Sequence, residues 1–84
     1  MVKGKMIKLY SAPASPGCEK VRRLLAYYRV PYQDFNVTVN SKAMKQWMKM
    51  SPDLEVPVIE FNGEIVIGFN SARLKANLGL SRIR

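Results

Sequence analysis

Histidine is absent from this 84-residue sequence, and cysteine occurs once. A single cysteine cannot form an internal disulfide, which excludes the small disulfide-stapled secreted scaffolds. The lack of histidine excludes zinc fingers, other histidine-based metal sites and a histidine general base, so we expect no metal site. The longest uncharged apolar runs are only as long as a strand, and the first ten residues lack the apolar stretch of a signal peptide. These absences predict no membrane segment and a place in the reducing cytoplasm.

Acidic residues are also scarce, with six Asp and Glu against fourteen Lys and Arg and a formal net charge of +8. Residues 1–50 hold ten of the basic residues but only Glu19 and Asp34 among the acids. Such a surface favours anionic partners, unless it serves only as a solvated face. Four aromatic residues lie near these charges in the sequence, but helical and strand spacing assigns two of them to the core. No recognised nucleic-acid motif is present, so we do not expect a nucleic-acid partner.

Apolar residues make up 48% of the chain and charged residues 24%, which is ordinary globular usage. The length allows one domain, and no linker, repeat or low-complexity stretch divides it. We therefore expect a single domain over residues 1–84, with frayed ends at 1–5 and 81–84, and a monomer.

The first half of the chain alternates between strand and helix patterns. Residues 6–10 form a strand-like run, and the prolines and glycine of residues 11–17 predict a loop. Apolar residues then recur at helical spacing from Cys18 to Tyr28, and Pro31 ends this helix. Alternation of apolar and polar residues over 35–39 predicts a second strand.

The second half predicts helix, hairpin and helix. Ser41 is the expected N-cap of a helix whose inward stripe contains Ala43, Met44, Trp47 and Met48. Residues 57–61 and 64–67 flank Asn62-Gly63, a strong signal for a hairpin turn with positive φ at both positions. Asn70 or Ser71 then caps a last helix that stops at Gly79. The order predicts an α/β fold, β-α-β-α-β-β-α, with a mixed four-stranded sheet flanked by helices.

Three segments of this sequence resemble the glutaredoxins and related small redoxins. In that family a strand ending in Tyr-Ser or Tyr-Thr precedes a Cys-Pro-x-Cys motif at the start of the first helix, and here Ser15-Pro16-Gly17-Cys18 takes that place. Glu55-Val56-Pro57 resembles the family's Thr-Val-Pro segment, whose proline is cis. Gly68-Phe69-Asn70-Ser71 resembles the turn before the last helix. The resemblance covers roughly residues 5–80, in the family's order and spacing.

The resemblance implies a thioredoxin-like fold of the glutaredoxin type and a thiol–disulfide oxidoreductase domain in electron transport and cell redox homeostasis. It implies no bound cofactor, admits glutathione as a co-substrate, and makes glutathione, a protein disulfide or a reductase the partner. Ser15 takes the position of the nucleophilic cysteine, and Cys18 that of the resolving cysteine. The implied substrate or glutathione-binding residues are Pro16, Gly17, Val56, Pro57, Gly68, Asn70 and Ser71. Within this set, the Val56 backbone would hold the cysteinyl part of glutathione, and the helix start at Asn70-Ser71 its γ-glutamyl carboxylate.

Ser15 is the main departure from the family pattern. A serine hydroxyl is hardly ionised near neutral pH and forms no S–S bond, so exchange should be impaired in the chain as written. Ser15 is an engineered replacement, a stand-in for selenocysteine, or a natural residue in a non-catalytic binding or adaptor module. Cys18 is then either a resolving thiol or a small buried hydrophobe. The family lysine of the preceding loop is replaced by Ala12, which makes a protein reductase an alternative electron donor.

Basic residues follow the motif directly. Lys20 or Arg22, if beside the loop, would raise the local positive potential and lower the pKa of a thiol at position 15. The alternative is that they lie on a solvated helix surface away from the loop.

Overall fold

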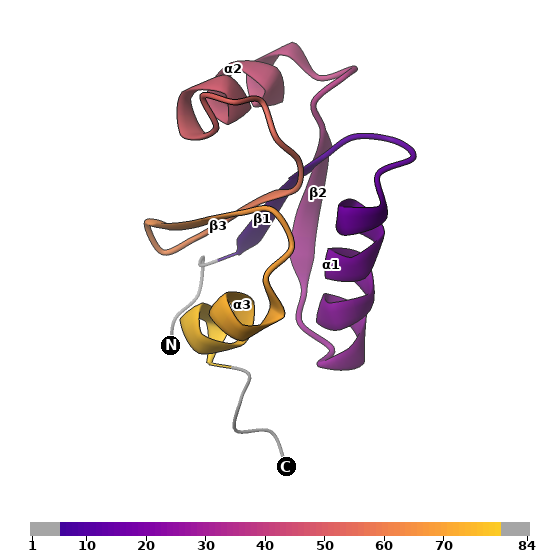
Figure 1. The fold of residues 1–84 in the computed structure, drawn as a ribbon, viewed down its shortest axis with the longest axis vertical. Helices are drawn as coiled ribbons and strands as arrows, with labels where there is room; N and C mark the ends of the chain where they lie inside the picture. The colour runs from indigo at the N-terminus through magenta and orange to yellow at the C-terminus, as the bar shows by residue number, and fades with distance from the viewer. Residues whose placement is uncertain (1–5, 80–84) are drawn as a thin grey trace.

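The computed structural model describes residues 6–79, so the expected fraying at 1–5 and 81–84 lies outside the described residues. The predicted element order is confirmed, with three helices and four strands in a single α/β arrangement (Figure 1). The elements are β1 (Ile7–Ser11), α1 (Pro16–Tyr27), β2 (Tyr32–Asn36), α2 (Ser41–Met50), β3 (Val58–Phe61), β4 (Glu64–Ile67) and α3 (Ser71–Leu78).

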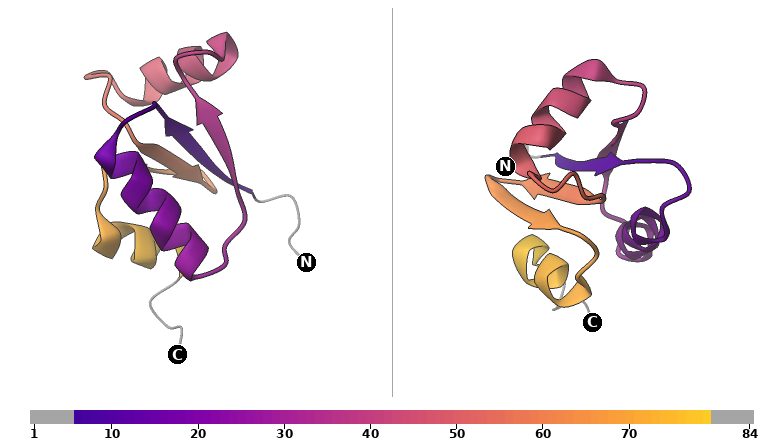
Figure 2. Two further views of the ribbon diagram at one scale, coloured as in Figure 1. Left: turned by 90° about the vertical axis from the view of Figure 1, so that its right-hand side faces the viewer. Right: turned by 45° about the horizontal axis from the view of Figure 1, so that its top comes forward.

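The sheet is mixed, as predicted, with the strand order β2-β1-β3-β4. β1 pairs in parallel with β2 and antiparallel with β3, while β3 and β4 form an antiparallel hairpin. Helices α1 and α3 cover one face of this sheet, and α2 lies on the other face (Figures 1 and 2). The βαβ unit and the hairpin therefore share β1 and β3 as the central strands.

Each face of the sheet has its own apolar core. Alternation along β1 directs Ile7 and Leu9 toward α1 and α3, where they pack with Val21, Leu25, Ile59, Val66 and Leu74. Tyr10 points to the opposite face and packs with Val37, Ala43 and Val58 beneath α2. The same alternation leaves Lys8 exposed on the α2 face of the strand.

Turn and cap residues behave as the sequence predicts in the hairpin turn and at both ends of α3. Asn62 and Gly63 have φ values of 57° and 82°, as the predicted hairpin turn requires. Gly79 has φ 69° and caps the C-terminus of α3. Of the two candidate caps for α3, Asn70 is the N-cap, because its side chain accepts the Arg73 N–H at 3.0 Å.

The predicted loop at 11–17 is too long at both ends. Ser11 belongs to β1, since its carbonyl accepts the Val37 N–H at 2.9 Å. Pro16 and Gly17 form the first turn of α1, where a proline fits because its position needs no N–H donor. The helix ends at Tyr27, ahead of Pro31.

The second strand is also displaced from its predicted range, 35–39, to Tyr32–Asn36. The Asn36 side chain accepts hydrogen bonds from the Thr38 N–H at 2.9 Å and the Thr38 hydroxyl at 2.5 Å. This local bonding turns the chain away from the sheet. Val39, predicted to alternate inward, is 79% exposed.

Helix α2 differs from its prediction in both cap and buried face. Its N-cap is Asn40 rather than Ser41, and the Asn40 side chain accepts the Ala43 N–H at 2.9 Å. Ala43, Trp47 and Met50, at i, i+4 and i+7, pack toward the sheet. Met44 and Met48 were predicted to face inward but are exposed, because their positions lie on the neighbouring side of the helix.

Candidate functional site

The three segments that resemble the redoxin motifs meet around Pro57. A Cβ atom added to Gly17 would lie 2.9 Å from Cδ of Pro57 and 3.9 Å from Cβ of Phe69. The Gly68 N–H donates to the Pro57 carbonyl at 2.7 Å. The start of α1, the segment before β3 and the turn before α3 therefore form one contiguous surface, although they are far apart in the sequence.

Ser15 is the N-cap of α1. Its backbone is extended, with φ −106° and ψ 116°, and its hydroxyl oxygen accepts the Cys18 N–H at 3.4 Å. The half-buried side chain thus faces the free N–H groups and the positive end of the helix dipole. An anionic atom on residue 15 would be stabilised here by the same groups.

Cys18 is fully buried, as the helical spacing predicts, and it is a free thiol. It lies on the inner side of α1 together with Val21 and Leu25. This burial agrees with a small hydrophobe, and its place one turn after Ser15 agrees with a resolving cysteine. The position of Cys18 thus fits both interpretations.

The Val56–Pro57 peptide bond is cis. Pro57 is fully buried and Val56 is half-buried. Glu55, the residue before Val56, is held through its backbone by two side chains at the end of α2. The indole N–H of Trp47 donates to the Glu55 carbonyl at 2.8 Å. The Ser51 hydroxyl accepts the Glu55 N–H, also at 2.8 Å. Trp47 and Ser51 thus position the segment that presents Val56.

Neither Trp47 nor Ser51 was recognised as a positioning residue from the sequence. Trp47 is the chain's one tryptophan, and its helical spacing indicated only a core position. A buried indole N–H usually finds an acceptor, and that rule is the signal that would have suggested a partner in the following loop. The partner itself depends on how the loop folds back, which the spacing does not determine.

The turn before α3 places Gly68 at φ 81° and leaves Asn70 exposed. The Asn70 side chain accepts the Arg73 N–H, and the Asn70 carbonyl accepts the Leu74 N–H at 2.9 Å. The N–H groups of Ser71 and Ala72 are in the first turn, where a helix supplies no internal acceptor. The start of α3 therefore offers donors next to Gly68 and Phe69.

The two basic residues that were predicted to influence this site are placed differently. The Lys20 ammonium lies 5.8 Å from the centroid of the Phe69 ring, which puts its charge beside the site. Arg22 donates from Nε to Asp34 at 2.8 Å and also pairs with Glu19 at 3.4 Å. The hydrogen bond to Asp34 raises the pKa of the Arg22 guanidinium, and these carboxylates offset its charge. Lys20 is thus the basic residue placed to act on the site.

Within residues 6–79, no group of three His, Cys, Asp or Glu side chains is arranged to hold a metal ion. Over the same residues, no helix has the length and hydropathy needed to cross a membrane.

Comparison with known proteins assigns the chain to a family. The Glutaredoxin family model matches residues 7–66, which is more than half of the sequence. The chain belongs to the glutaredoxin family. A Clostridium pasteurianum relative, described as an uncharacterized glutaredoxin-like 8.6 kDa protein in the rubredoxin operon, is 36% identical over 69 residues. Those residues cover 82% of this chain and 92% of the relative.

Solved structures of this family and its neighbours share the fold. Methanosarcina acetivorans methanoredoxin matches with a TM-score of 0.79 and 25% identity, over 93% of this chain and 97% of that chain. A Drosophila mojavensis glutathione transferase homologue with bound glutathione matches with a TM-score of 0.71 and 26% identity. That match covers 94% of this chain but only 36% of the homologue. The predicted glutaredoxin-type thioredoxin fold is confirmed, whereas the individual roles of Ser15, Cys18 and the binding residues stay predictions.

Proposed function

We propose that this chain is a glutaredoxin-like thiol–disulfide redox domain with its exchange site at the start of α1, beside Pro57. Ser15 occupies the position of the family's nucleophilic cysteine. The observation that carries the proposal is the combination of Ser15 at the helix N-cap, one turn before buried Cys18, with Gly17 packed against Pro57. This arrangement supplies the positive end of a helix to the side chain at position 15 and an adjacent surface to a substrate.

The proposed chemistry requires a thiol at position 15. A thiolate there attacks one sulfur of a substrate disulfide, forms a mixed disulfide and releases the other sulfur as a thiol. The Cys18 thiolate then attacks the sulfur at position 15, which releases the reduced substrate and leaves a disulfide between positions 15 and 18. Two glutathione thiols or a protein reductase supply the two electrons that reduce this disulfide again. Ser15 cannot take the first step, so the chain as written is impaired in exchange.

Glutathione is the proposed co-substrate. Trp47 and Ser51 hold the segment that presents the Val56 backbone, which would pair with the cysteinyl part of the tripeptide. The donors at the start of α3 and the Lys20 ammonium would face its carboxylates. The bound glutathione in the structurally similar Drosophila mojavensis homologue supports this choice. Lys20 would thus supply the positive charge that the family's loop lysine, replaced here by Ala12, would otherwise provide.

The test compares the chain as written with Ser15→Cys and with the double variant Ser15→Cys/Cys18→Ser. The substrate is the mixed disulfide of glutathione with 2-mercaptoethanol, with turnover coupled to glutathione reductase and NADPH; a second arm uses thioredoxin reductase and a protein disulfide. We expect no turnover by the chain as written and turnover by Ser15→Cys. The double variant should accumulate a covalent adduct with glutathione, visible by mass spectrometry. A folded Ser15→Cys protein with both thiols intact and no activity in either arm would overturn the proposal.

The second candidate function is a non-catalytic adaptor that binds an extended peptide on the same surface. The observation that favours it is Ser15 itself, because a hydroxyl keeps the N-cap hydrogen bond while removing exchange chemistry. A partner retained equally by the chain as written and by Ser15→Cys, with no covalent link, would support this function. The codon for residue 15 in the native gene distinguishes the explanations of Ser15. A serine codon supports the adaptor, and a cysteine or UGA codon supports the redox domain.

A further inference from the structure

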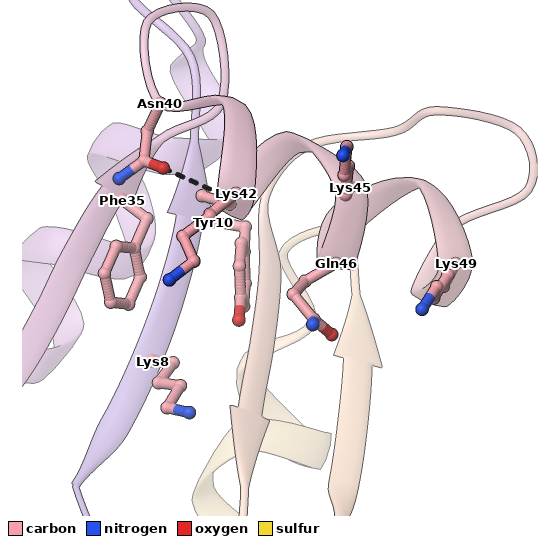
Figure 3. A pocket seen from close by; sticks show the side chains of 9 residues that line it. Lys8, Tyr10, Phe35, Asn40, Lys42, Lys45, Gln46 and Lys49 are labelled. Carbon is pink, nitrogen blue, oxygen red and sulfur yellow. Dashed lines mark hydrogen bonds between the residues drawn. The ribbon is translucent and has the colours of Figure 1, made fainter.

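A groove of about 560 Å³ lies on the α2 face of the sheet, away from the face that α1 and α3 cover (Figure 3). Its floor contains Tyr10, Phe35 and Ala43. The rings of Tyr10 and Phe35 are stacked, with centroids 5.5 Å apart and an angle of 29° between their planes. The rim carries Lys8 from β1 and Lys42, Lys45 and Lys49 from α2. The lining thus combines two aromatic rings with four lysines.

Two interactions of the α2 lysines are unfavourable to the helix, although Lys49, in the last turn, lies near the favourable negative end of the dipole. Ser41–Met50 contains no acidic residue, and Lys42 lies in the first turn, next to the positive end of the helix dipole. Lys45 and Lys49 are at i and i+4, where like charges repel. The ion pairs found among residues 6–79 all involve Arg22, so none of them offsets the groove lysines. An anion in the groove would relieve each of these unfavourable interactions.

The polar groups of the rim are mainly hydrogen-bond donors. The Asn40 carbonyl oxygen already accepts the Ala43 N–H, which leaves its NH₂ group as a donor at the groove (Figure 3). Lysine ammonium groups can only donate. Among the described carboxylates, that of Glu60 lies near the groove. It is close enough to the Tyr10 hydroxyl to raise the pKa of Tyr10, and Glu60 is opposite Lys8 in the strand register. A lining of this kind suits a ligand whose polar groups are acceptors, such as phosphates.

The dimensions indicate a small ligand with more than one anionic group. The volume falls within the range of about 300–1,000 Å³ that is typical of sites for single small molecules. Lys42 and Lys49 are seven positions apart in the helix, which corresponds to about 10 Å along the axis. A single phosphate does not span this row of charges, whereas a chain of two or three phosphates approaches both ends.

We propose that this groove binds a nucleoside di- or triphosphate. The base lies against the half-buried ring of Phe35, which is itself stacked on the buried ring of Tyr10, and the phosphates contact Lys42, Lys45 and Lys49. Aromatic side chains accept any base through stacking, and lysine is a frequent phosphate ligand. The site is separate from the exchange site at Ser15, so the two are expected to bind their ligands independently.

The test measures ATP binding by isothermal titration calorimetry at fixed ionic strength. The groove variant is Lys45→Gln/Lys49→Gln, and Arg23→Gln/Arg29→Gln is its control, because it removes the same net charge from exposed positions on and just after α1. Loss of two charge-assisted contacts should weaken ATP binding roughly tenfold or more in the groove variant and less than about twofold in the control. Circular dichroism checks that both variants are folded.

Three further ligands determine which part of ATP is recognised. Adenosine and inorganic tripolyphosphate should each bind at least roughly tenfold more weakly than ATP, because each lacks one of the two recognised parts. The proposal would be overturned if tripolyphosphate bound as tightly as ATP, or if ATP affinity fell equally in the groove and control variants. Either result would show that ATP is attracted only by the net positive charge of the protein. A short single-stranded oligonucleotide that binds far more tightly than ATP, and loses binding in the groove variant, would also overturn it in favour of a nucleic-acid strand. Absence of ATP binding would refute it directly.

Discussion

Replacing Gly17 with alanine sets two effects of opposite sign against each other. Alanine is the better helix former, and in the absence of other contacts the change would stabilise α1 by up to about 1 kcal/mol. The new Cβ, however, would lie 2.9 Å from Cδ of Pro57, an atom in a ring that is fully buried. Cδ cannot swing away as the end of a flexible side chain would, so the start of α1 or the Pro57 segment must move.

The expected size of the effect follows from these two contributions. Overpacking of a filled contact costs about 1–3 kcal/mol, which exceeds the gain in helix propensity. We therefore expect Gly17→Ala to lower the free energy of unfolding by about 1 kcal/mol. For a domain of this size, such a loss corresponds to a decrease in Tm of roughly 4–8 °C. The displacement would also separate the N-cap residue Ser15 from the surface around Pro57.

Thermal and urea unfolding followed by circular dichroism measure this effect. The matched control is Ala26→Gly, which makes the reverse change at an exposed position of the same helix and should destabilise by about 1 kcal/mol through propensity alone. Destabilisation by both variants is the signature of the contact with Pro57. A stabilised Gly17→Ala protein would refute the close approach of Gly17 and Pro57, because propensity would then be the only effect in operation.

Three other predictions concern individual side chains. Asn70→Ala removes the N-cap acceptor of α3 and should cost about 1 kcal/mol in urea unfolding, with Asn70→Ser keeping most of the stability; equal losses would contradict the capping role. Asp34→Asn breaks the ion pair with Arg22 but keeps an oxygen that can accept the Ser11 hydroxyl, so it should cost about 1 kcal/mol at low salt and less at high salt; a salt-independent loss would assign the effect to the Ser11 hydrogen bond and count against the ion pair. Burial raises the pKa of Tyr10 above its ordinary value of 10.0, and the carboxylate of Glu60 raises it further. The stability that Tyr10 contributes is therefore present below pH 10 and is lost as the pH rises through the folded-state pKa. Tyr10→Phe should reduce the loss of stability in urea titrations above pH 10, and an unchanged pH dependence would contradict the shift.

Local chemistry made much of the fold predictable. The Asn62-Gly63 turn and the stop at Gly79 depend on residues that tolerate positive φ, and such signals act over a few positions. The errors came where a short side chain bonds to a nearby backbone or side-chain group. Asn36 ends β2 in this way, and Asn40 takes the capping role that the sequence suggested for Ser41. The sequence shows that both residues are capable of such bonds but not which bonds form.

The site was predictable as a set of segments rather than as a surface. The motif around Ser15, the Val56-Pro57 pair and the turn at Gly68 were located by resemblance to a family. Their contacts, such as Gly17 against Pro57, depend on the sheet that brings the segments together. The groove on the α2 face was missed for the same reason: its lysines were visible in the sequence, but the strand that supplies Lys8 comes to α2 only in the folded chain.

The central place of β1 has a consequence for the order of events during synthesis. Leu9 pairs with Asp34 on one side and with Ile59 on the other, so one edge of this early strand has no partner until β3 has been translated. An open strand edge in a nascent chain can pair with other chains, and closing it requires a contact across most of the sequence. The exchange surface is completed later still, because Phe69 follows the hairpin. A ribosome-bound fragment therefore carries position 15 without the surface that selects its substrate, and selectivity arises only when the domain is nearly complete.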